Sequence, residues 1–168
     1  MEELSWERVR ELLDYDMETG VFTWKVDRLP RVHAGDVAGY QDGGYWKIRT
    51  GGRNHHASRL AILWVTKKWP ENEVDHINRN TKDNRYENLR DATRAQNQQN
   101  RTVREDSTTG FKGVRFQRSA HGNRCGYYVA QIGVGGKRIY LGSFKTAEEA
   151  HKAYMVAAKA HHKQFARI

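Results

Sequence analysis

The chain has 168 residues and a formal net charge of +9, a length that suits about one ordinary domain or two to three very small ones. Its single cysteine, Cys125, excludes a disulfide within the chain and a zinc site built from several cysteines. The acidic start has no apolar run after it, and no apolar stretch approaches the roughly 20 residues of a membrane span, so we expect a cytoplasmic protein without a signal peptide.

Residues 1–50 predict a small α+β lead-in, and their 7 Lys and Arg against 10 Asp and Glu give a net charge of −3. A helix is expected over residues 5–14, because its apolar residues share one face and Ser5 can act as the N-cap. The rest of the lead-in predicts a strand at residues 21–24 and a hairpin in which residues 36–40 and 45–49 flank a turn at 41–44.

Residues 51–105 carry a net charge of +4 and predict a helix followed by a strand–loop–strand–helix. The first helix covers residues 57–68, where Leu60, Leu63 and Trp64 recur at helical spacing, and it ends before Pro70. The later elements are a strand at residues 73–77, a polar loop at 78–87, a short strand at 88–90, and a helix that is capped by Thr93 and runs to about residue 104.

Asp75 and His76 are neighbours on the first of these short strands, so their side chains point to opposite faces and can serve different tasks. The polar loop leads to Asn88, and the capped helix carries Asn97. A segment of this size can bring Asp75 and Asn97 together around one ion. Carboxylate and amide oxygens are hard ligands that suit Mg²⁺ or Mn²⁺, and a histidine that titrates near neutrality suits the activation of a water molecule.

Each of these four residues alone has an ordinary structural explanation as a turn residue, a cap or a satisfied polar side chain. Their occurrence in order, inside a basic chain, favours a nuclease over that explanation. Phosphodiester hydrolysis needs an activated water, an ion that neutralises developing charge, and protonation of the leaving oxygen. A histidine suits the first task, and a metal ion with one of its waters suits the other two.

The same segment resembles phage-type HNH homing endonucleases, which contain a ββα-metal motif. Within residues 10–100, the lead-in contributes Leu13-Asp14-Tyr15-Asp16, Thr19-Gly20 and Thr23-Trp24-Lys25 to this resemblance. The central motif is made of Asp75-His76-Ile77-Asn78, Asp83-Asn84-Arg85, Glu87-Asn88-Leu89-Arg90 and Gln96-Asn97-Gln98-Gln99-Asn100.

The resemblance implies that His76 is the general base and that Asp75 and Asn97 are the metal ligands. It also implies that Asn88 orients the histidine through the loop backbone, so the chain is similar to the H-N-N variant of the motif. Arg59-Leu60-Ala61 matches a His-Arg-Leu-Ala stretch of the family, but Ser58 stands where the histidine is usual. His55 or His56 could substitute in part for that histidine.

Residues 106–168 carry 11 Lys and Arg against 3 Asp and Glu, a net charge of +8 that points to a polyanionic partner. Strands are expected at residues 112–118, 127–134 and 138–144, followed by a helix that opens with the capping box at Thr146. Alternation along the strands predicts one apolar face that receives an alanine-rich helix. The opposite face is expected to carry Arg115, Gln131, Arg138 and Tyr140.

This C-terminal segment resembles the APETALA/ethylene-response-factor DNA-binding domain. The motifs are Lys112-Gly113-Val114-Arg115, Ala130-Gln131-Ile132, Tyr140-Leu141-Gly142-Ser143-Phe144 and Thr146-Ala147-Glu148-Glu149-Ala150. The resemblance implies that Lys112, Arg115, Gln131, Arg138 and Tyr140 face DNA. Gly133 replaces an arginine of the plant pattern and Tyr140 replaces a tryptophan, so the sequence preference is expected to differ. Further DNA contacts are expected from Arg59, Arg90 and Arg101.

The sequence therefore predicts an α+β protein with a lead-in at residues 1–50, a ββα-metal nuclease core at 51–105, and a three-stranded antiparallel sheet packed on one helix at 106–168. The predicted activity is that of a Mg²⁺- or Mn²⁺-dependent HNH endonuclease of homing or nicking type, targeted to double-stranded DNA by its C-terminal domain. A non-catalytic DNA-binding regulator with a degenerate nuclease core is the alternative, and an RNA-binding accessory protein is a third possibility that fits the charge but not the catalytic set.

Overall fold

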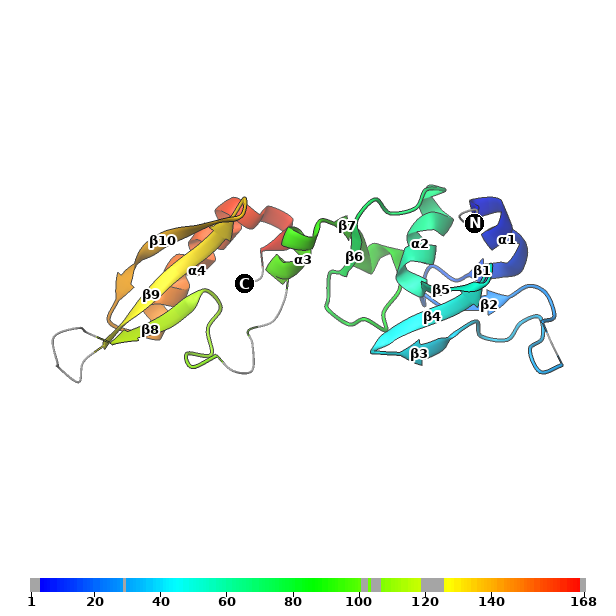
Figure 1. The fold of residues 1–168 in the computed structure, drawn as a ribbon, viewed down its shortest axis with the longest axis horizontal. Helices are drawn as coiled ribbons and strands as arrows, with labels where there is room; N and C mark the ends of the chain where they lie inside the picture. Colours follow the sequence, from blue (N-terminus) through cyan, green and yellow to red (C-terminus); the bar gives the residue numbers. More distant parts are fainter. Residues whose placement is uncertain (1–3, 29, 101–102, 104–106, 119–125, 167–168) are drawn as a thin grey trace. The chain divides into compact units, whose positions relative to one another are not determined.

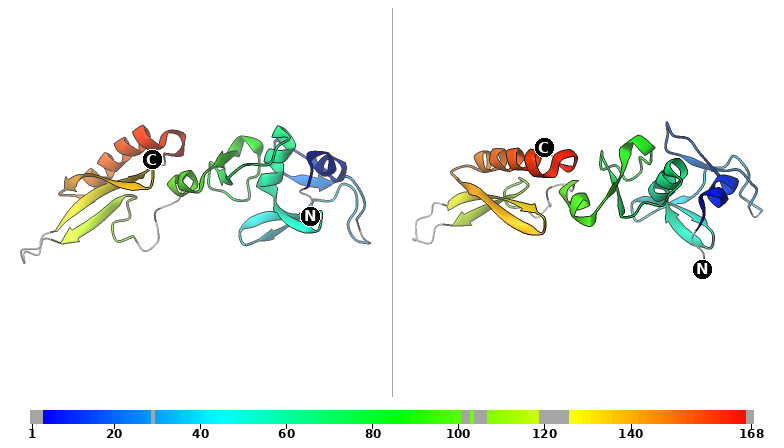
Figure 2. Two further views of the ribbon diagram at one scale, coloured as in Figure 1. Left: turned by 45° about the horizontal axis from the view of Figure 1, so that its top comes forward. Right: turned by 90° about the horizontal axis from the view of Figure 1, so that it is seen from above.

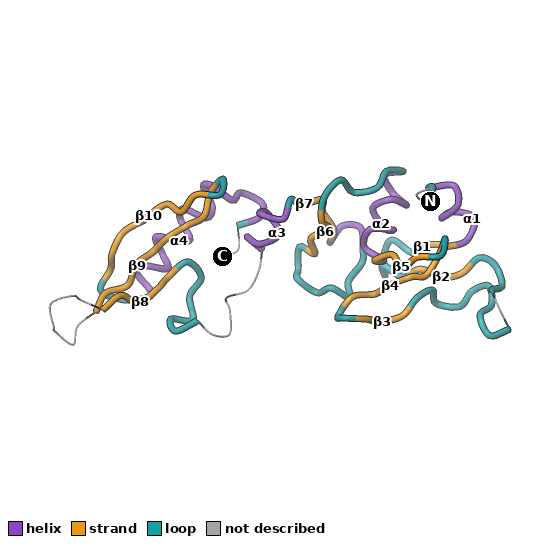
Figure 3. Tube along the Cα trace, viewed as in Figure 1, coloured by secondary structure: helices purple, strands orange, loops and turns teal. Residues whose placement is uncertain are grey.

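The structure is a computed structural model that describes residues 4–28, 30–100, 103, 107–118 and 126–166. The chain divides into two compact units, Met1–Arg94 and Ala95–Ile168, and each is described by itself (Figure 1). Both units combine helices with antiparallel strands, as the trace coloured by secondary structure shows (Figure 3). The protein is therefore of the α+β class that the sequence predicts.

The first unit opens with helix α1 (Trp6–Leu12), and Ser5 caps it by accepting a hydrogen bond from the backbone N–H of Arg8 at 3.2 Å. The helix is shorter than expected, because Leu13 adopts an extended conformation and begins strand β1 (Leu13–Tyr15). This strand pairs with β2 (Phe22–Trp24), and its two apolar residues are buried on either side of an exposed aspartate. Strand-like alternation therefore overrides the helical pattern at the end of α1.

A three-stranded sheet follows, made of β3 (Tyr40–Asp42), β4 (Tyr45–Thr50) and β5 (Arg53–His56). The first strand extends to Asp42, beyond the expected end at residue 40, because Gly43 and Gly44 both have positive φ and alone form the turn, so that Asp42 pairs directly with Tyr45. The last strand was not predicted, since its sequence is wholly polar and shows no apolar alternation. It leads directly into helix α2 (Ala57–Thr66).

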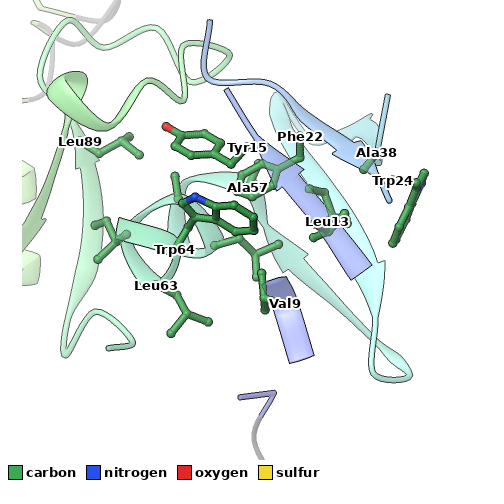
Figure 4. Close-up of a cluster of buried hydrophobic side chains, with 14 residues drawn as sticks. Val9, Leu13, Tyr15, Phe22, Trp24, Ala38, Ala57, Leu63, Trp64 and Leu89 are labelled. Atoms are coloured by element: carbon green, nitrogen blue, oxygen red, sulfur yellow. The ribbon is translucent and has the colours of Figure 1, made fainter. Parts of the chain in front are cut away.

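The core of this unit lies around α2, where one face buries Leu60, Ala61 and Leu63. An aromatic cluster continues from this face, with the rings of Tyr15 and Phe22 stacked at 4.5 Å between centroids and the edge of Trp64 at 6.2 Å from Phe22 (Figure 4). The residues of β1 and β2 thereby pack on the helix that precedes the predicted site.

The predicted site segment follows α2 as two short antiparallel strands, β6 (Glu73–His76) and β7 (Leu89–Ala92). A polar loop and the 3₁₀ helix η1 (Tyr86–Asn88) connect them. Helix α3 (Arg94–Asn100) comes next in the chain, and residues from Ala95 onward belong to the second unit.

The second unit holds the three-stranded antiparallel sheet that the sequence predicts, with order β10–β9–β8. Its elements are β8 (Val114–Arg118), β9 (Gly126–Val134), β10 (Lys137–Phe144), helix α4 (Ala147–His162) and the 3₁₀ helix η2 (Lys163–Phe165). Helix α4 lies along one face of the sheet (Figure 2). It buries Ala150, Tyr154 and Ala158 against Ala130 and Ile132 of β9, so the apolar faces meet as expected.

Candidate active site

Asp75 and His76 end strand β6, and both side chains are nearly inaccessible to solvent. As neighbours on a strand they face opposite ways, and their partners differ accordingly. Asp75 pairs with Arg90 of β7, whereas His76 contacts Asn84 in the connecting loop. The local fold thus separates a carboxylate from an imidazole over one peptide bond.

The carboxylate of Asp75 is held by the guanidinium of Arg90, its partner in the strand register. Oδ2 of Asp75 accepts a hydrogen bond from Nε of Arg90 at 2.8 Å and forms an ion pair with Nη2 at 2.6 Å. Arg90, which was predicted to contact DNA, is therefore paired with a carboxylate, and both side chains are nearly buried. Such a partner holds a carboxylate in one orientation, which is how ligands of metal ions are commonly fixed.

The imidazole of His76 lies with its Nε2 3.3 Å from Oδ1 of Asn84. The amide nitrogen of Asn84 donates to the carbonyl of Lys82, which turns Oδ1 toward the histidine, so Nε2 carries the proton and donates. Nδ1 of the neutral ring then has the lone pair. Burial lowers the pKa of His76 below its usual value and outweighs the opposing effect of the Asn84 hydrogen bond.

Asn88, at the end of the loop between β6 and β7, is bonded to the start and to the middle of that loop. Its Oδ1 accepts from the backbone N–H of Asn78 at 2.9 Å, and its Nδ2 donates to the carbonyl of Asp83 at 2.8 Å. Asp83 is in turn paired with Arg85, which holds the pKa of that carboxyl at about 2. These contacts fix the loop that carries Asn84.

Asn84 and Tyr15 are site residues that sequence reasoning missed. Asn84 is buried, and its carbonyl accepts a 2.7 Å hydrogen bond from the hydroxyl of Tyr15 in β1. Asn84 stands inside a motif that carried the resemblance, but nothing in a single sequence separates it from the other asparagines of the loop. Tyr15 lies 69 positions away, and only the fold brings it to the loop.

The hairpin of β3 and β4 also reaches the loop. Thr81 donates its hydroxyl to the carbonyl of Gly44 in the hairpin turn at 2.6 Å. The adjacent Tyr45 ring lies 5.1 Å from the ring of His56 and 6.4 Å from the ring of His76, measured between centroids. The lead-in therefore contributes side chains beside the candidate base.

The nuclease core has three further predicted site residues, Arg59, Asn97 and Arg101. Arg59 donates to the carbonyls of Asn72 and Pro70, so its guanidinium joins α2 to the following loop. Asn97 lies in α3, which belongs to the second unit, whereas Asp75, His76 and Asn88 lie in the first. Arg101 lies outside the described residues.

The predicted DNA-binding residues of the second unit mostly share one face of its sheet. Arg115 pairs in register with Val129, and Tyr140 with Gln131, two positions along β9, so these side chains lie on the face away from α4. Arg138, two residues before Tyr140, belongs to the same face. Lys112 differs, because its ammonium group donates to the carbonyl of Gln99 near the end of α3.

In a comparison with protein families, residues 55–99 match the model of a family described as HNH endonuclease. This segment is an HNH endonuclease domain. The protein is accordingly a nuclease, a phosphodiester hydrolase that acts on DNA, and HNH nucleases generally depend on a divalent metal ion. The matched segment runs from β5 into α3 and includes Asp75, His76, Asn84, Asn88 and Asn97.

Neither the curated proteins nor the solved structures gave a match to the chain. Across the part of the chain that the structure describes, no helix is both long and apolar enough to span a membrane. The described residues also contain no group of three or more His, Cys, Asp or Glu side chains arranged to hold a metal ion. Carboxylate oxygens, such as those of Asp75, are the kind of ligand that a hard divalent cation takes.

Proposed function

We propose that the protein is a metal-dependent DNA endonuclease of homing or nicking type, in which His76 is the general base and the second unit directs cleavage to its DNA sites. The observation that carries this proposal is the environment of His76 inside the matched HNH segment: a buried imidazole whose Nε2 is held by Asn84. A histidine fixed in this way presents one defined nitrogen to a water molecule.

The protonation state of His76 suits this role. A lowered pKa keeps the imidazole neutral at neutral pH, so Nδ1 can accept a proton from the attacking water. The N–H of Nε2 donates to Oδ1 of Asn84, and Asn88 holds the loop in which Asn84 lies. Asn84 and Asn88 thereby orient the base, which is the part of the reaction that this chain's own residues perform.

The proposed cofactor is Mg²⁺ or Mn²⁺, with the carboxylate of Asp75 as an oxygen ligand. The resemblance to HNH endonucleases implies Asn97 as a second ligand. When bound, such an ion stabilises the negative charge that develops on the phosphate and assists departure of the leaving oxygen. Asp75 is suited to this role because the guanidinium of Arg90 fixes its carboxylate from one side.

The outer face of the C-terminal sheet is the proposed DNA-reading surface, as the resemblance to the APETALA/ethylene-response-factor domain implies. Antiparallel strands fit the major groove, where arginine can read guanine edges. Arg115 is exposed and its guanidinium is oriented by Gln117 at 2.7 Å, while Tyr140 is 59% exposed and hydrogen-bonds to Ser143. Arg138 adds an exposed cation to the same face.

A non-catalytic DNA-binding protein with a degenerate nuclease core is the second candidate, and the Asp75–Arg90 pair is the observation that favours it. A guanidinium at 2.6 Å offsets the negative charge of the carboxylate and so weakens its attraction for a divalent cation. The two candidates differ in whether DNA is cut when Mg²⁺ is supplied.

Cleavage of supercoiled plasmid DNA with and without Mg²⁺ tests the proposal. We expect nicking in Mg²⁺ or Mn²⁺, loss of nicking after chelation by EDTA, and an unchanged circular dichroism spectrum, because the proposed ion has a catalytic role and no structural one. Intact plasmid under all metal conditions would favour the degenerate core, and a spectrum that collapses on chelation would reveal a structural metal instead.

A further inference from the structure

One face of the β3–β4–β5 sheet gathers polar and ionisable side chains. Lys47 and His56 are direct cross-strand partners, and Asp42 is the partner of Tyr45. Since directly opposed residues and residues two apart on a strand share a face, all four side chains lie on one side of the sheet. Nothing in the proposed mechanism uses this face.

Two contacts place this face beside the nuclease site. The ring of Tyr45 is in contact with the ring of His56 at 5.1 Å and lies 6.4 Å from that of His76. The turn next to Tyr45 is joined to the loop between β6 and β7 by the 2.6 Å hydrogen bond from the hydroxyl of Thr81 to the carbonyl of Gly44. A DNA strand whose scissile phosphate approaches His76 therefore passes close to the side chains of this face.

The chemistry of the face suits an anion. Lys47 is partly exposed and holds Asp42 at 2.6 Å as its counter-ion. The pKa of His56 is lowered, first by burial and then by the nearby cations Lys47 and Arg59, which marks a locally positive environment. A phosphate oxygen can take over the position of the Asp42 carboxylate on the ammonium group, because both are anionic oxygens that accept charge-assisted hydrogen bonds.

Building on the proposed nuclease function, we propose that Lys47 and His56 form a binding subsite for a phosphate group of the DNA strand next to His76. The ammonium of Lys47 and an imidazole N–H of His56 donate to the non-bridging phosphate oxygens. Tyr45 lies next to both imidazole rings, and Asp42 holds Lys47 in position until the phosphate replaces it. Part of the lead-in is thus part of the substrate site.

Substitutions of Lys47 and of Asp42 are expected to have different effects on DNA affinity, and this difference tests the subsite. Binding of a fluorescent double-stranded DNA 30-mer to the full chain is measured in EDTA over a range of salt concentrations. Lys47→Met should weaken binding about 10-fold and reduce the slope of log affinity against log salt by about 0.9, the loss of one phosphate contact. Asp42→Asn should keep or increase the affinity, because it removes the competing carboxylate. Equal losses in both variants, or no change in Lys47→Met, would overturn the subsite.

His56 has a matched control in its neighbour His55, whose side chain lies on the other side of β5, with its ring stacked on Trp69 at 5.5 Å. His56→Ala should lower the plasmid cleavage rate at limiting protein about 10-fold. His56→Gln, which keeps an N–H donor, should recover part of it, and His55→Ala should cleave like the wild type. Thermal unfolding followed by circular dichroism confirms that each variant is folded at the assay temperature. Equal rates for His55→Ala and His56→Ala would contradict the proposal.

Failure of this inference can be told apart from failure of the nuclease proposal by including His76→Ala. If His76→Ala is inactive while Lys47→Met and His56→Ala behave as wild type, the subsite is wrong and the proposed function stands. If His76→Ala still cleaves at the wild-type rate, the proposed function is wrong whatever the subsite variants do.

Discussion

At the scale of single residues, the burial of His76 sets the pH range over which the protein should cut DNA. A general base acts in its deprotonated form, and burial lowers the pKa of His76 below 6.5. Activity should therefore persist below pH 6.5, and the acid limb of the rate profile should fall at lower pH. Single-turnover cleavage rates at fixed Mg²⁺ across pH 5 to 8 measure this, and a limb centred above pH 6.5 would be inconsistent with His76 as a buried base.

The substitution Asn84→Asp tests whether the acid limb of this profile reports the pKa of His76. A carboxylate at the position of the amide oxygen would stabilise the imidazolium form, so it should raise the pKa of His76 and move the acid limb to higher pH. A variant that merely loosens the loop would lower the rate without moving the limb. The direction of the shift therefore separates positioning of the base from general support of the fold.

At the scale of secondary-structure elements, local pattern predicted most of the chain. Helix α2 follows from Leu60, Leu63 and Trp64 at helical spacing, and α4 from its capping box, in which Thr146 accepts from the backbone N–H of Glu149 at 3.2 Å. Strand β5 has no apolar alternation to signal it. Its pairing with β4 is a tertiary contact, and such contacts override local propensity.

The site residues also differ in whether a single sequence can reveal them. Asp75, His76 and Asn88 stand in a motif that a single sequence can reveal, and the resemblance to HNH endonucleases implies a role for each of them. Tyr15 and Tyr45 reach the site from strands that precede α2, and only their packing shows it. The pairing of Arg90 with Asp75 could not be predicted either, since each residue alone fits a role toward DNA or metal.

Helix α4 and strand β9 come close at Gly113, and this contact gives a stability prediction. A Cβ at this position would overlap the ring of Tyr154 and lie 2.7 Å from the carbonyl of Gln131, and its φ of +72° disfavours other residues. Gly113→Ala should therefore destabilise the protein by about 2–4 kcal/mol, combining overpacking with backbone strain. Denaturant unfolding measures this loss. Gly133→Ala is the control, because its Cβ would meet nothing within 4 Å, and equal losses in the two variants would refute the explanation.

At the scale of the whole molecule, positive charge is concentrated in residues 106–168, which carry +8 of the total +9. If the outer face of the sheet reads DNA, Arg115→Ala should cost about 1–3 kcal/mol of binding free energy and relax the preference at one base pair. A phosphate contact would instead weaken binding evenly across sequences. Titration of the full chain with a panel of DNA duplexes distinguishes the two. Lys145→Ala, at an exposed lysine beyond β10, is a charge-matched control, and equal effects of both variants would argue against a specific reading face.

One comparison of variants decides whether the HNH domain cuts DNA with His76 as its base. Single-turnover cleavage of supercoiled plasmid in Mg²⁺ is measured for the wild type and for His76→Ala, alongside DNA affinity in EDTA. We expect His76→Ala to lose roughly 10²- to 10⁴-fold in rate, the usual contribution of a general base, and to keep its affinity. A His76→Ala protein that cuts at close to the wild-type rate would show that His76 is not the base.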